Sequence, residues 1–281
     1  MKKLIINADD LGVSDAVNEA AESCLKSAVI TGVSVMPCGR RFREAAAMLR
    51  NMGFVEAGIH LTLTGGLKPI SGGADSLRSS DGHFPANYMH LARLSLTGRV
   101  KVRHVRDEFT AQIEALRNEG LKITHIDGHE HVHMLPGILR CVIDLAKEHG
   151  IKYIRIPLER SSYLLEGAYA VDIFRHAVLK PLAATALKEV KKAGLFSNSH
   201  FLGHIHSGRI NENVLALMLG RMEEGVNEIA FHPAVFTKGL LGCTPRQADS
   251  ARELKTLLES GWRKRAEELG IRPVTHKEAS S

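Results

Sequence analysis

Histidines and acids are concentrated in one short stretch of the chain, residues 125–133, which read HIDGHEHVH. Neutral imidazole and carboxylate are common ligands of first-row divalent metals, so this stretch predicts a metal site. It also contains a literal HExxH, from His129 to His133, which indicates a zinc protease only when both histidines share one face of a helix. Gly128 before the motif and Pro136 after it leave little space for a helix, so we disfavour the protease interpretation.

Residues far from this stretch can join the same site. Asp9 and Asp10 end a buried apolar run, and adjacent residues on an extended chain point to opposite sides. One of these carboxylates can therefore bind a metal while the other faces an attacking water. His60 lies at the end of a second apolar run and His232 follows another, and the group as a whole is hard to explain by packing.

The elements expected along the chain alternate between strands and helices. Apolar runs predict strands at residues 3–8, 30–35, 55–61, 122–127, 153–156, 201–204 and 228–231. Helical periodicity predicts helices at 17–28, with Ser14 as N-cap, and at 41–50, 102–116, 137–149, 172–193 (interrupted by Pro181), 214–222, 250–259 and 263–269. This order indicates one parallel α/β domain over residues 1–281, either a barrel or a doubly wound sheet.

The positions of the polar residues favour the barrel. In a parallel barrel the C-terminal ends of all strands surround one mouth, whereas a doubly wound sheet concentrates its site at one switch point. The reactive side chains follow many different strands, from Asp9 to His232. We therefore expect a (β/α) barrel, with residues 64–85 forming a long loop that is a candidate substrate lid.

Composition excludes several other classes of protein. The 281 residues are 44% hydrophobic and 24% charged, an ordinary globular mixture. The net charge of +6 is spread along the chain and only 5% of residues are aromatic, so we expect no nucleic-acid partner. The apolar start meets Asn7 too early for a signal peptide, no run approaches a membrane span, and the four cysteines form no CxxC. We expect a cytoplasmic protein.

Four short motifs occur in a recognisable order. NADD lies near the start, GIHLTL surrounds His60, THIDGHEHVH surrounds His129 and FHPA surrounds His232. The set resembles the YdjC-like carbohydrate deacetylases, which include a hopanoid-biosynthesis-associated branch, from Lys3 to about Leu269. The resemblance implies a (β/α) barrel of the polysaccharide-deacetylase type, removal of an N-acetyl group from an amino sugar, and a homodimer.

The resemblance also implies roles for particular residues. Asp10, His60 and His129 would bind the metal, Asp9 would be the general base, and His232 would be the general acid or would stabilise the oxyanion. Two positions depart from the family pattern. Position 130 is Glu where some members have His, and position 234 is Ala where many have Gly.

The chemistry itself sets further expectations. A metal with open positions activates water and polarises the acetyl carbonyl. Asp127 is expected to orient an imidazole, and Arg155 to hold Asp9 ionised by its charge; structural roles remain open for both. Further candidates for supporting or substrate-binding roles are His125, His131, His133 and His206. The resemblance implies Mg²⁺, whereas two imidazoles and one carboxylate suit Zn²⁺ better.

The substrate and two alternative functions stay open. Residues 172–193 form a basic, partly apolar stretch that fits peripheral contact with an anionic membrane, and hence a glycolipid substrate, or simply a solvated helix. A metal-containing barrel that binds sugar without catalysis is one alternative. A non-haem iron oxygenase shares the ligand set but is disfavoured by the barrel pattern.

Overall fold

The computed structural model describes residues 1–162, 169–236 and 247–281. Cys243, one of the four cysteines, lies outside the described residues. Among the described helices, none combines the length and apolarity that crossing a membrane requires.

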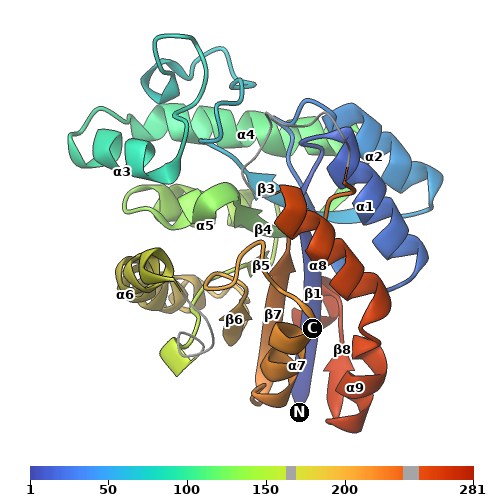
Figure 1. Ribbon diagram of the computed structural model, residues 1–281. Helices are drawn as coiled ribbons and strands as arrows, with labels where there is room; N and C mark the ends of the chain where they lie inside the picture. Colours follow the sequence, from blue (N-terminus) through green and yellow to red (C-terminus); the bar gives the residue numbers. More distant parts are fainter. Residues whose placement is uncertain (163–168, 237–246) are drawn as a thin grey trace.

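A curled parallel sheet forms the centre of the molecule (Figure 1). Its strands run in the order β5-β4-β3-β2-β1-β7-β6, and β8 pairs with the first residues of β1. Their bounds are β1 Lys2–Leu11, β2 Gly32–Val35, β3 Glu56–Leu61, β4 Lys122–Gly128, β5 Tyr153–Ile154, β6 His200–Leu202, β7 Gly225–Phe231 and β8 Ile271–Pro273. The strands predicted from apolar runs are thereby confirmed, with small shifts at their ends.

The two edges of this sheet are joined beside β5. The Ile154 amide donates to the Phe196 carbonyl at 3.0 Å, and the Phe196 amide donates to the Lys152 carbonyl at 2.8 Å. Phe196 precedes β6 by a few residues, so these bonds link the β5 edge to the segment that enters β6. The predicted barrel is confirmed, because the curled sheet surrounds one interior instead of opening at a switch point.

Helices surround the sheet (Figure 1). They are α1 Asp15–Lys26, α2 Phe42–Asn51, α3 Tyr88–Leu96, α4 Val102–Asn118, α5 Ile138–Glu148, α6 Ala170–Lys192, α7 Glu212–Gly220, α8 Gln247–Glu259, α9 Trp262–Glu268 and α10 His276–Ala279. Ser14 caps α1 as predicted, since its hydroxyl accepts from the Val17 amide. Sequence periodicity missed α3, α10 and β8; the last two are only 4 and 3 residues long, too short for a periodic signal.

The long helices bury the apolar stripes that the sequence marks. On α4, Val105, Phe109, Ile113 and Leu116 are fully buried, whereas Val102 is 50% exposed and lies outside the stripe. The interruption predicted at Pro181 is wrong: α6 continues through it. Pro181 itself is exposed and has no amide to donate within the helix, and the Thr185 hydroxyl donates to its carbonyl at 3.1 Å.

Residues 64–85 form the expected long connection, with a single 3₁₀ turn at Asp75–Leu77. The loop is fastened to α4 by Glu108, a buried carboxylate. Its oxygens accept the amides of Ile70 at 3.0 Å and Ser71 at 2.8 Å. A role as a substrate lid stays a prediction.

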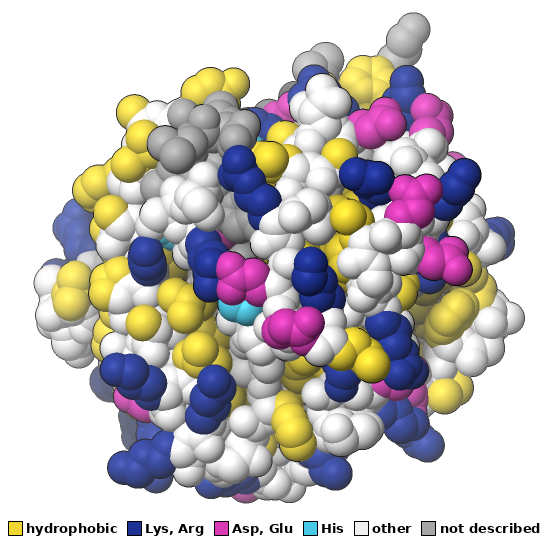
Figure 2. Space-filling model, turned by 90° about the horizontal axis from the view of Figure 1, so that it is seen from below, with side chains coloured by type: hydrophobic (Ala, Val, Ile, Leu, Met, Phe, Trp, Pro, Cys, Tyr) yellow, Lys and Arg dark blue, Asp and Glu magenta, His cyan; other side chains and the backbone are white. Residues whose placement is uncertain are grey.

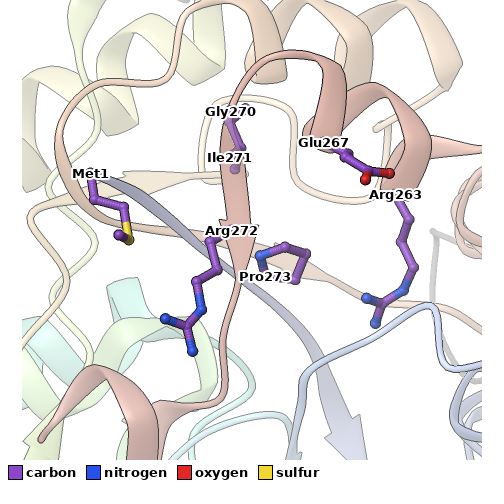
Figure 3. A pocket seen from close by; sticks show the side chains of 7 residues that line it. All are labelled: Met1, Arg263, Glu267, Gly270, Ile271, Arg272 and Pro273. Atoms are coloured by element: carbon purple, nitrogen blue, oxygen red, sulfur yellow. The ribbon is translucent and has the colours of Figure 1, made fainter.

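The N-terminal end of the barrel lies opposite the strand ends that carry Asp10, His60 and His129. Figure 2, seen from below, shows lysine and arginine side chains spread over this face with acids between them, not one basic patch. A hollow of about 450 Å³ opens here beside Met1, lined also by Arg263, Arg272 and neighbours (Figure 3). Active sites of such barrels lie at the opposite end.

Candidate functional site

Three predicted ligands meet at the C-terminal ends of β1, β3 and β4. Asp10 Oδ1 lies 3.2 Å from His60 Nε2 and 3.0 Å from His129 Nδ1. One ligand atom from each residue lies within 4.8 Å of the other two. Asp10 has a left-handed backbone, with φ of 64°, which lets β1 turn at its end.

The charges in this group favour an ionised carboxylate. Burial raises the pKa of Asp10, but the neighbouring His129 and His60 outweigh it and hold that pKa well below its usual range. Burial likewise lowers the pKa of His60, but Asp127, Asp10 and Asp9 outweigh it and raise the pKa to about 10. Without a metal, a proton on the His60 imidazole therefore balances part of the buried negative charge.

The donor set fits one divalent cation. Ligands placed cis about an octahedral ion at about 2.1 Å are about 3.0 Å apart, and those about a tetrahedral ion somewhat farther. The two Asp10–imidazole separations, 3.0 and 3.2 Å, fall in this range. His60 also has the partner that metal-binding imidazoles usually have, since its Nδ1 lies 2.8 Å from Asp127 Oδ1.

Asp9 faces a different set of partners from Asp10. The Arg155 guanidinium donates to both of its oxygens, from Nη1 to Oδ2 at 2.6 Å and from Nη2 to Oδ1 at 2.9 Å. The side-chain amide of Asn7 donates from Nδ2 to Asp9 Oδ1 at 2.7 Å. A carboxylate offers about four lone pairs, so among the described residues Oδ2 retains capacity for one more donor.

His232 lies across from Asp9 at the end of β7. Its Nε2 is 4.0 Å from Asp9 Oδ2, and its Nδ1 is 3.8 Å from Glu253 Oε2. Burial lowers the pKa of His232, but Glu253, Asp9 and Asp10 outweigh it and raise the pKa above its ordinary value. The Asp9 carboxylate, which can accept one more hydrogen bond, therefore lies opposite the His232 imidazole, whose raised pKa favours the protonated form.

Beneath these groups, Arg155 is the centre of a buried charge network. Besides Asp9 it contacts Asp127 Oδ2 at 2.8 Å and Glu228 Oε1 at 2.6 Å, and it is fully buried. Glu228 also accepts from the Tyr153 hydroxyl at 2.9 Å and lies 3.2 Å from His276 Nε2. Arg155 thus touches Asp9, as expected, and also compensates two further carboxylates.

Sequence reasoning missed several of these partners. They are Tyr153, Glu228, Glu253 and His276, together with Ser34, whose hydroxyl donates to Asp127 Oδ2 at 2.6 Å. The sequence does contain a sign of Glu228, because a charged residue within an apolar run is expected to have a buried partner. The others stand in ordinary strand or helix contexts, and only the fold brings them to the site.

The remaining histidines of the cluster occupy separate places. His125 lies below the site, where Ser34 Oγ is 3.0 Å from its Nε2 and the His276 ring stacks on it at 3.3 Å. Gly58 makes room for this ring, because a Cβ there would lie 2.1 Å from His125 Nε2. His206 is buried in the segment after β6.

The HExxH motif does not form a protease site. Glu130 and His131 both have left-handed backbones, with φ of 49° and 58°, so the motif is not one regular helix. His133 Nε2 donates to the Arg155 carbonyl at 2.9 Å instead of facing the metal group. Of the two motif histidines, only His129 joins Asp10.

Comparison with known proteins places the chain among relatives of one family. Residues 3–268 match the family model described as YdjC-like protein. A carbohydrate deacetylase of Thermoanaerobacter pseudethanolicus is 27% identical over 265 residues, covering 92% of each chain. A carbohydrate deacetylase of Brevibacillus brevis is 35% identical over 155 residues, 55% of this chain and 59% of the relative.

A solved structure supports the fold. The crystal structure of a proposed cellobiose-phosphate cleavage protein from Enterococcus faecalis V583 superposes with a TM-score of 0.80 at 24% identity, covering 99% of this chain and 98% of that one. At this identity the likeness concerns the fold alone. Together with the match of the family model over nearly the whole length, these findings show that the chain belongs to the YdjC-like protein family.

Proposed function

We propose that this protein is a metal-dependent deacetylase that removes the N-acetyl group from an amino sugar. The proposal rests on one observation: a candidate set of metal ligands and a candidate acid–base pair lie side by side at the C-terminal end of the barrel. Asp10, His60 and His129 converge as a metal-binding set. Asp9 and His232 face one another beside it, 4.0 Å apart, as an acid–base pair. The names of the relatives agree with this activity.

Asp10, His60 and His129 would hold the metal. When bound, the metal would supply Lewis-acid polarisation of the acetyl oxygen and lower the pKa of a coordinated water. Asp127 holds the His60 ring in place through Nδ1. The resemblance favours Mg²⁺ and the nitrogen-rich ligand set favours Zn²⁺, so the ion is a question for the experiment.

The proton transfers follow from the chain's own residues. Asp9 accepts a proton from the attacking water, whose oxygen forms a bond to the acetyl carbon. Arg155 keeps the Asp9 carboxylate fixed and compensates its charge. His232 donates its proton to the sugar nitrogen as the carbon–nitrogen bond breaks, so the products are acetate and a free amine.

The test measures acetate release from N-acetylglucosamine oligomers and from an N-acetylglucosaminyl lipid. We expect release by the purified protein, its loss with a chelator, and its recovery with either Mg²⁺ or Zn²⁺ added singly. Metal-loaded protein that binds the sugars without releasing acetate would instead support a non-catalytic binding barrel.

The surface of α6 bears on the choice between free and lipid-linked sugars. Val171, Phe174 and Val178 recur at helical spacing and are 50%, 66% and 49% exposed. Lysines 188, 191 and 192 are exposed on the same helix. We propose that this face rests on an anionic bilayer. Replacing Phe174 by Asp should abolish sedimentation of the protein with phosphatidylglycerol vesicles, and unchanged sedimentation would contradict the proposal.

The expected homodimer is tested by sedimentation equilibrium.

A further inference from the structure

We propose that His131 is a substrate-positioning residue whose Nε2–H donates a hydrogen bond to an oxygen of the bound sugar. This inference rests on the proposed deacetylase function and names a contact within that site.

The backbone at Glu130 and His131 has an uncommon conformation for residues other than glycine. Glu130 and His131 are consecutive left-handed residues, directly after the ligand His129. Non-glycine side chains rarely adopt this region, and such strain is concentrated at functional sites. The turn directs the His131 ring toward β6, where it meets Phe201 edge-on at 5.8 Å and His204 at 5.3 Å.

The His131 ring is positioned by contacts with neighbouring rings, and no hydrogen bond to a described residue fixes it. Its Nδ1 is buried without a partner among the described residues. The side chain as a whole is partly exposed, and no hydrogen bond joins its Nε2 to any part of the chain that the structure describes. A proton on Nδ1 would be a buried donor with no acceptor, which is rarer than an unmatched acceptor, so the proton belongs on Nε2.

His133, two residues further along the chain, is a histidine with a structural role. His133 has the same unmatched Nδ1, but its Nε2 donates to the Arg155 carbonyl and thereby ties the motif to β5. His131 makes no such bond to any residue that the structure describes, so its donor remains for a ligand. Sugar hydroxyl and carbonyl oxygens are the acceptors that a bound substrate would bring to this wall of the mouth.

The test uses two variants and a control. His131→Asn removes the Nε2–H while suiting the left-handed backbone, and His131→Phe keeps the ring and removes both nitrogens. His90→Gln, on the exposed surface of α3, controls for the loss of a histidine. We expect both His131 variants to raise KM for N-acetylglucosamine oligomers roughly tenfold, the value of one hydrogen bond, with kcat within about twofold.

Calorimetry separates this inference from the proposed function. The affinity of each metal-loaded variant for the same oligomers should fall by the same factor as KM rises, with one bound metal and an unchanged midpoint of thermal unfolding. If the wild type binds the sugar but releases no acetate, the proposed function fails while the binding comparison still decides the role of His131. Equal affinity and KM in wild type and His131→Asn would overturn the inference, as would a loss of bound metal in that variant.

Discussion

Arg155 and Asp9 form a two-pronged ion pair in the centre of the barrel, although 146 positions separate them in the chain. The guanidinium also contacts Asp127 and Glu228, so one buried cation compensates three buried carboxylates. The same contact orients the proposed base and stabilises the fold. Changes to either residue will therefore alter both activity and stability.

Replacing Arg155 by Met should destabilise the protein by at least about 3–5 kcal/mol, because three buried carboxylates would lose their cation. Arg155→Lys should restore little of this, since an ammonium cannot reproduce the two-pronged geometry. The free energy of unfolding in urea measures the effect. Arg160→Met, at an exposed ion pair with Glu223, is the matched control and should change stability by no more than about 1 kcal/mol. A comparable loss in both variants would refute the central role of Arg155.

Asp9→Asn should lower kcat by roughly 10²–10⁴-fold, because the amide cannot accept the proton of the attacking water. Metal content and sugar affinity, measured by elemental analysis and calorimetry, should be retained because Asp10, His60 and His129 are unchanged. Asp15→Asn is the control, since Asp15 is an exposed carboxylate in the first turn of α1. Acetate release at the wild-type rate by Asp9→Asn would remove Asp9 from the mechanism.

Asp127→Asn should weaken metal binding by about 10–100-fold, since His60 would lose the carboxylate that fixes its orientation and raises its basicity. A competition titration against a chromophoric chelator gives the affinity. Asp144→Asn, at an exposed pair with Arg140 on α5, should bind metal as tightly as wild type. If both variants bind equally well, the Asp127–His60 contact serves the fold alone.

Glu253→Gln should shift the alkaline limb of the kcat profile toward lower pH. Burial opposes the raised pKa of His232, and Glu253 is the largest of the contributions that maintain it. A raised pKa keeps His232 protonated, and able to act as an acid, up to a higher pH; losing the carboxylate therefore brings the loss of activity to lower pH. Glu259→Gln, at the exposed end of α8, should leave the profile unchanged. An unmoved alkaline limb in Glu253→Gln would argue against His232 as the acid.

Local patterns were sufficient to predict most of the sheet. Apolar runs of four to seven residues marked the strands β1 to β7, although β5 and β6 are only two and three residues long in the structure, and the order of strands and helices limits the sheet to parallel pairing. The site followed from the same logic, because the C-terminal ends of parallel strands meet at one mouth. For that reason Asp9, Asp10, His60 and the histidine cluster could be grouped from the sequence, although 119 positions separate Asp10 from His129. The narrower choice of Asp10, His60 and His129 as ligands came from the family resemblance.

Only the tertiary structure shows what each histidine of residues 125–133 contacts. The two histidines of HExxH are four positions apart, a separation that suits a helix, but left-handed backbones at Glu130 and His131 turn His129 toward Asp10 and leave His133 on the Arg155 carbonyl. Likewise, Glu228, Glu253 and His276 join the site through contacts distant in the chain. Periodicity reports which face of an element is buried, whereas the partners of a buried polar side chain depend on how separate elements pack, and that packing exists only in the folded molecule.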